Sequence, residues 1–174
     1  MRVSQVTIRT LWNAARLLLV VTAFAALTGC PSSLAVGGGL FGVRIVKVDS
    51  VTGPTGTTLT VSVLIDRADG IAGGDLIITF DASKVTAVGA TTTSLTGGFI
   101  LEANPQPGVL KVSFANATAI SSGQGALVDL ELRLAPGVGS GTCIALSLRS
   151  DSQLFAESGQ VIPMQRQDGE LCAP

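Results

Sequence analysis

The sequence contains no histidine and no tyrosine, and its single tryptophan, Trp12, lies near the N-terminus. These absences remove the residues that most often act as general bases and proton donors in enzymes. The paired carboxylates Asp129 and Glu131 lie two apart in a strand-like stretch, so they would share one solvated face. The glycine-rich segment 137–141 lacks the spacing of a nucleophile elbow. We therefore predict that the chain is not an enzyme.

Aromatic residues are scarce in general, which bears on carbohydrate binding. Sugar-binding faces need flat, exposed aromatic rings, usually Trp or Tyr, on which the apolar face of a pyranose stacks. After the N-terminal segment the chain offers only phenylalanines, and at least Phe80 and Phe114 fall at inward-facing positions of predicted strands. Direct binding of a polysaccharide is the alternative function, but the sequence shows no aromatic platform on which a sugar ring could stack.

Metal-ligating patterns are also missing. Two cysteines without any histidine do not complete a tetrahedral zinc site. Four aspartates fall in predicted loops, but they do not form the twelve-residue ligand pattern of an EF-hand; they are Asp66, Asp69, Asp81 and Asp151. We predict neither a metal site nor any other cofactor in this chain.

Long apolar runs are limited to the N-terminal segment. The run Leu17–Leu27 is too short for a membrane span, which needs about 20 residues, but three arginines and no acidic residue accompany it, as in a signal peptide. The sequence Leu27-Thr28-Gly29-Cys30 resembles the lipobox of bacterial lipoproteins. An ordinary secretory signal that happens to contain a cysteine is the alternative.

The lipobox resemblance implies a domain organisation. It predicts a signal peptide over 1–29, a lipid attached to Cys30, and a short flexible tether over 30–42 that is rich in Gly and Ser. The mature protein would then lie in the cell envelope, anchored to the outer membrane or to the outer leaflet of the plasma membrane. Residues 43–174 remain for a single folded domain.

Positive charge is sparse after the predicted signal peptide. The segment 1–29 holds three of the 11 basic residues and none of the 12 acidic ones, so the mature chain carries 8 (11 − 3) against 12, a net charge of −4. Nucleic-acid binding requires basic residues to neutralise phosphates. We therefore predict no nucleic-acid partner.

Two cysteines, Cys143 and Cys172, remain in the predicted mature domain. Disulfides form and persist in exported proteins, so we expect these two residues to pair. Two separate buried thiols are the alternative.

The segment 43–174 has no helical periodicity. Short β-branched runs recur between clusters of Gly, Pro, Asp and Asn, which is the pattern of an all-β sandwich. One run alternates strictly, with Val128 and Leu130 on the face opposite Asp129 and Glu131. Nine strands are predicted, at 43–48, 58–65, 75–80, 85–91, 99–103, 109–114, 126–134, 142–148 and 167–172.

The order of several short motifs along the domain resembles that of a cohesin domain. These motifs are Val51–Val61, Gly70–Asp75, Phe80–Val85, Val112–Asn116 and Ile120–Leu127. Their order and spacing together carry the resemblance. The resemblance implies a nine-stranded β-sandwich with jelly-roll topology, and it implies binding of dockerins, which are calcium-loaded helical modules of cellulosomal enzymes.

The resemblance also implies a binding face. In cohesins this face belongs to the sheet that contains strands three, five, six and eight, with an aspartate near the start of strand three, a position matched by Asp75. Gly73 departs from the pattern, because many type I cohesins carry an asparagine there. By alternation, four further residues share the outward face with Asp75: Ile77, Thr79, Lys111 and Ser113.

We therefore expect a non-catalytic module at the cell envelope that binds a dockerin-like partner during extracellular polysaccharide degradation. Calcium would belong to the partner, not to this chain. Among the face residues, Ile77 is the most informative prediction, because an exposed isoleucine beside polar residues suits a small docking surface. A structural envelope lipoprotein without a specific ligand is a further alternative.

Overall fold

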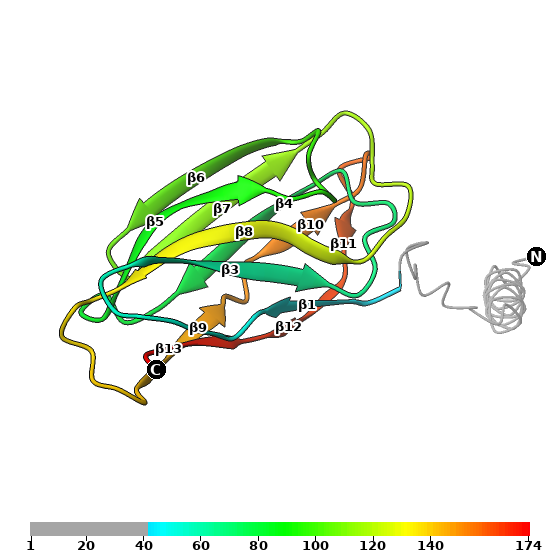
Figure 1. Cartoon of the computed structure of the whole chain (residues 1–174). Coiled ribbons are helices and arrows are strands. Elements are labelled where there is room, and N and C mark those ends of the chain that lie inside the picture. Colours follow the sequence, from blue (N-terminus) through cyan, green and yellow to red (C-terminus); the bar gives the residue numbers. More distant parts are fainter. Residues whose placement is uncertain (1–41) are drawn as a thin grey trace, which may run out of the picture. The chain divides into compact units, whose positions relative to one another are not determined.

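The computed structural model of the chain describes residues 42–174 (Figure 1). The predicted signal peptide, Cys30 and all but the last residue of the predicted tether lie outside the described residues. Within residues 42–174 no helix is long and apolar enough to cross a membrane. The regular structure there consists of β-strands, which confirms the all-β prediction.

Thirteen strands follow one another along the described chain. They are β1 (Arg44–Val48), β2 (Val51–Thr52), β3 (Thr58–Ile65), β4 (Gly73–Thr79), β5 (Val85–Thr92), β6 (Ile100–Gln106), β7 (Val109–Ala115), β8 (Gly125–Leu134), β9 (Cys143–Leu148), β10 (Gln153–Phe155), β11 (Val161–Ile162), β12 (Met164–Gln167) and β13 (Gly169–Cys172). All nine predicted strands are present. The short strands β2, β10 and β11 were not predicted, and the end of β12 was merged with β13 in one predicted strand.

The strands form two sheets packed as a sandwich (Figure 1). One sheet has the order β12-β1-β3-β8-β5. The other has the order β11-β10-β4-β9-β13-β2, with β7 also paired to β4 and β6 to β7. Predicted strands three, five, six and eight are β4, β6, β7 and β9, so they share one sheet, as the resemblance implied.

Two of the places where the chain passes from one sheet to the other lie side by side. Between β1 and β2 it crosses at Asp49, and between β12 and β13 it crosses at Asp168. The crossings approach closely at Gly169, where a Cβ atom would lie 2.4 Å from the carbonyl oxygens of both Val48 and Asp49. A residue without a side chain is therefore required at this position.

The core lies between the two sheets and is formed by the inward residues of alternating strands. In β8, Leu130 and Leu132 have no exposed surface, whereas the intervening Glu131 is partly exposed. Val61 and Val63 in β3 and Leu76 and Ile78 in β4 are also fully buried. The alternation read from the sequence therefore assigns the inward faces correctly.

A disulfide closes the C-terminal part of the domain. Cys143 and Cys172 are bonded and stand opposite each other in the antiparallel pair β9–β13. The predicted pairing is confirmed. Glu170 places a carboxylate near the two sulfur atoms, but sulfurs joined in a disulfide are not thiolate ligands for a metal.

The close crossing at Gly169 yields a prediction about stability. Gly169→Ala forces a methyl group against two backbone oxygens, which cannot rotate away, and should lower the free energy of unfolding by about 3 kcal/mol. Urea denaturation of the purified full chain in mild detergent measures this change. The control is Gly137→Ala, because a Cβ there meets no atom within 4 Å. Equal stability of the two variants would contradict the close approach.

Candidate functional site

Strand β4 is the centre of the sheet that contains the predicted binding face. Along one edge it pairs with the whole of β7, from Gly73 opposite Ala115 to Thr79 opposite Val109. Along the other edge it pairs first with β10 and then, at Ile78 and Thr79, with β9. The loop 149–152 separates β9 from β10 and runs beside Ile77. Both edges of β4 are therefore occupied.

A buried polar link holds this loop against β4. The Ile77 N–H donates to the Ser152 hydroxyl at 2.9 Å, and the Arg149 N–H donates to the Ile77 carbonyl at 2.9 Å. Ser152 is fully buried, and its carbonyl accepts a hydrogen bond of 2.8 Å from the Arg166 guanidinium on β12. The loop thus replaces the missing strand pairing of Ile77 and connects the two sheets.

The five predicted face residues lie together on the outward side of β4 and β7. Asp75 stands opposite Ser113, whose hydroxyl donates to the carboxylate at 2.6 Å. Ile77 stands opposite Lys111, and Thr79 occupies the next outward position along β4. The structure therefore brings together all five side chains.

Ile77 differs in one respect from the prediction. It faces outward, but it is half-buried rather than freely exposed, at the point where loop 149–152 borders its strand. The most exposed apolar residue of this face is Ile100 on β6, at 82%. Sequence reasoning missed Ile100 because the predicted strand 99–103 has apolar residues on both faces, so alternation does not mark this isoleucine as outward.

An apolar row crosses the sheet at the end where β4 begins. The pairings place Ile100 opposite Ala115, Ala115 opposite Gly73, Gly73 opposite Phe155, and Phe155 opposite Val161. Ile100 and Val161 are exposed, Phe155 is half-buried, and none of the five residues carries a charge. This row joins strands that are far apart in sequence.

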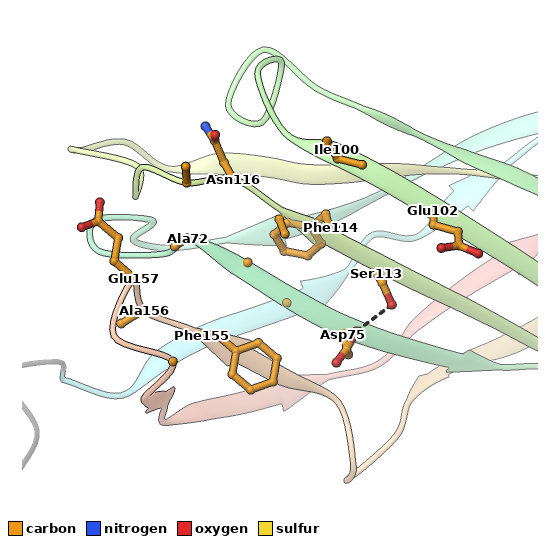
Figure 2. A pocket seen from close by; sticks show the side chains of 15 residues that line it. Ala72, Asp75, Ile100, Glu102, Ser113, Phe114, Asn116, Phe155, Ala156 and Glu157 are labelled. Atoms are coloured by element: carbon orange, nitrogen blue, oxygen red, sulfur yellow. Dashed lines mark hydrogen bonds between the residues drawn. The ribbon is translucent and has the colours of Figure 1, made fainter.

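An open cleft of about 500 Å³ lies over the part of this row from Ile100 to Phe155 (Figure 2). Ile100 and Phe155 line it, together with Asp75, Glu102 and Glu157. Figure 2 shows Ile100 and Phe155 in this lining, with the hydrogen-bonded Ser113 and Asp75 beside them. The cleft thus combines apolar surface with carboxylates.

Gly73 lies within this row, where the resemblance indicated a departure from the usual asparagine. A Cβ atom at Gly73 would lie 2.8 Å from the Phe114 carbonyl oxygen and 3.4 Å from the Ala115 Cα. Any side chain here would require a shift of the backbone of β7. The glycine is therefore a structural requirement of this β4–β7 pairing, and it leaves the cleft open.

The other acidic candidates have structural partners. The Asp66 carboxylate accepts the Ile45 N–H at 2.8 Å, Asp69 pairs with the buried Arg44 at 3.1 Å, and Asp151 pairs with Arg149 at 2.8 Å. These contacts agree with turn and capping roles.

Asp81 also acts as a local cap. Its carboxylate accepts hydrogen bonds from the hydroxyl and the N–H of Ser83, and these bonds, together with Lys84, lower its pKa. Asp129 and Glu131 lie on the outward face of the opposite sheet, where Asp129 accepts from the Ser62 hydroxyl at 2.6 Å. Neither feature belongs to the cleft.

Comparisons with known proteins agree with this architecture. The family model described as the cohesin domain matches residues 45–163. No curated protein matches the sequence.

Solved structures of similar fold come from bacteria and an archaeon. The sixth cohesin of scaffoldin B from Acetivibrio cellulolyticus, solved with a mutant Cel5 dockerin, has a TM-score of 0.68 and 20% identity, covering 76% of this chain and 100% of that one. A non-cellulosomal cohesin from Archaeoglobus fulgidus has a TM-score of 0.66 and 20% identity over 76% and 92% of the two chains. CaCohA2 from Clostridium acetobutylicum has a TM-score of 0.65 and 21% identity, covering 76% of this chain and 92% of that one.

The loop that borders the face provides a second stability prediction. Ser152→Ala leaves the partly buried Ile77 N–H without an acceptor and should lower the free energy of unfolding by about 1–3 kcal/mol. Ser150→Ala, in the same loop but exposed, should change it by less than about 0.5 kcal/mol. Urea denaturation of both variants checks the difference. If Ser152→Ala were as stable as Ser150→Ala, the hydroxyl would not be what holds the loop.

Proposed function

Because this chain belongs to the cohesin domain family, we propose that it is a non-catalytic module that binds a dockerin-like partner protein. The observation that carries the proposal is the outward face of β4 and β7, where Asp75, Ile77, Thr79, Lys111 and Ser113 form one contiguous surface. Several relatives of similar fold were solved as complexes with dockerins, which supports the same kind of partner here.

Binding on this face relies on surface complementarity between preformed partners. The sheet is rigid because both edges of β4 are paired, so little conformational entropy is lost when a partner docks. The Asp75 carboxylate, oriented by Ser113, offers an acceptor next to the half-buried Ile77. An apolar contact beside an oriented acceptor is the usual composition of a small interface centre. In this reading any calcium belongs to the partner.

The composition of the cleft supports a binding role rather than catalysis. Its lining offers carboxylates, Ser113 and Asn116 but no histidine or cysteine within the described chain. Asp75, the carboxylate at the centre of the face, is engaged by a serine hydroxyl rather than by a second acid. This arrangement lacks the histidine that would activate a serine.

The location of the protein is part of the proposal. A lipid on Cys30, followed by a tether over 30–42, would attach the domain to the outer membrane or to the outer leaflet of the plasma membrane. The chain enters the domain at Gly42, whose carbonyl accepts from Arg44, and Arg44 also contacts Asp69 in the loop that leads to β4. Gly42 and the cleft therefore lie at the same end of the domain, so a polysaccharide-degrading partner would bind near the point where the chain enters it.

Direct carbohydrate binding lacks a comparable observation. Of the phenylalanines in the described chain, Phe114 is buried, and Phe80, Phe99 and Phe155 are each only half-buried. No pair of exposed rings forms a platform there.

Affinity capture tests the proposal. The full chain is immobilised and an extract of the source organism is passed over it. We expect it to retain a protein with duplicated calcium loops and to release that protein when calcium is chelated. Asp75→Lys should reduce retention at least about tenfold, because it reverses a charge at the centre of the interface. Glu131→Lys makes the same change in charge on the opposite sheet and should retain the partner normally.

Two outcomes would contradict the proposal. Retention of the partner that is equally strong with Asp75→Lys and with the unaltered chain would move the interface to another face. Retention of polysaccharide alone, with no calcium-dependent protein, would favour the carbohydrate-binding alternative.

A further inference from the structure

The cleft over Gly73 has an apolar lining that is accessible to a partner. Ile100 is 82% exposed on one side of Gly73, and the half-buried Phe155 lies on the other. Single exposed apolar residues are common on protein surfaces. These residues are distinctive because the strand register aligns them in one row across a hollowed part of the sheet.

The cleft is kept open by backbone geometry and not by a movable side chain. Gly73 has no room for a Cβ atom, because the Phe114 carbonyl oxygen would lie 2.8 Å away. On the next strand, the exposed Ala115 adds only a methyl group to the row. A partner side chain can therefore enter the cleft without displacing any residue of this chain.

The polar part of the lining is acidic. It contains Asp75, Glu102 and Glu157, whereas none of the 15 lining residues in the described chain is Lys or Arg (Figure 2). The Ser113 hydroxyl donates to Asp75 and the Ala119 N–H donates to Glu157. The carboxylate of Glu102, which stands opposite Ser113, accepts no hydrogen bond and forms no ion pair within residues 42–174.

A partner that covers this cleft must compensate the carboxylates. Removing an ionised carboxylate from water without a compensating partner costs several kcal/mol. Lys111 lies on the same face, opposite Asn104, which is the next outward position of β6 after Glu102. It forms no ion pair with Glu102. The compensating positive charge must therefore come from the partner.

We propose that the partner inserts one aliphatic or aromatic side chain between Ile100 and Phe155 and places a lysine or arginine beside Glu102. This inference rests on the proposed function, because it assigns the partner chemistry of the same face. It adds a selectivity rule: a basic residue next to an apolar anchor is accepted, and an acidic residue in the same place is rejected.

Four synthetic helical peptides of about 16 residues test the rule, since residues four apart lie side by side on a helix. They are identical except for one such pair, which is Leu/Lys, Leu/Glu, Ser/Lys or Ser/Glu. Their affinity for the purified full chain is measured by fluorescence polarisation. We expect the Leu/Lys peptide to bind at least about tenfold more tightly than each of the others, because it alone satisfies both requirements.

Variants of the chain separate the apolar and the charged contributions. Ile100→Asp should weaken the binding of the Leu/Lys peptide about tenfold. Glu102→Lys should make the chain bind Leu/Glu more tightly than Leu/Lys, because the charge complementarity is reversed. Val88→Asp and Glu131→Lys are matched controls, as Val88 is 47% exposed and Glu131 faces outward on the opposite sheet. Both controls should bind all four peptides like the unaltered chain.

The proposal is overturned if the unaltered chain binds Leu/Glu as tightly as Leu/Lys, if Glu102→Lys does not change the preference, or if no peptide binds at about 5 mM, beyond the range expected for such small contacts. None of these results affects the capture of a calcium-dependent protein through Asp75. Failure of the selectivity rule is therefore distinguishable from failure of the proposed function.

Discussion

The pairing of β4 on both of its edges is the constraint on which the rest of the candidate site depends. β7 fixes one edge over the whole strand, while β10, the loop 149–152 and β9 divide the other edge. Because strand pairing sets register, it also decides which side chains share the outward face. A slip of one residue would turn Asp75 and Ile77 into the core and bring Leu76 and Ile78 to the surface.

The interruption between β9 and β10 is stabilised by polar contacts and not by apolar packing alone. Ser152 accepts from Ile77 and is itself held by Arg166 of the other sheet. These residues are separated by many positions in sequence, and each looks like an ordinary surface residue there. The packing of the two sheets therefore also fixes loop 149–152, which borders the outward face of β4.

Local pattern was sufficient for the parts of the fold that depend on alternation. The period of two in β8 and β7 identified inward and outward residues correctly, and the prediction of an exported chain led to the expected Cys143–Cys172 pairing, which is present. The face of Asp75, Ser113 and Lys111 followed from the same alternation, once the family resemblance had placed the two strands in one sheet. Each of these inferences needs only short-range information or a known strand order.

The cleft could not be predicted in this way. Its apolar row exists because β6, β7, β4, β10 and β11 adopt one particular register, and no single segment contains that information. Gly73 was recognised as a departure from the family, but its physical cause, the Phe114 carbonyl oxygen beneath a missing Cβ, appears only in three dimensions. Likewise, β10 and β11 have too few residues for a periodic signal.

The central claim is that partners dock on the outward face of β4, β6 and β7, and isoleucine methyl groups report on it directly. Ile77 and Ile100 lie on this face, whereas Ile45, 38% exposed, lies on the outward face of the opposite sheet. In methyl NMR spectra of the full chain, addition of the calcium-dependent partner should shift or broaden the signals of Ile77 and Ile100 and leave that of Ile45 in place. Perturbation of Ile45, with Ile77 and Ile100 unchanged, would contradict the account.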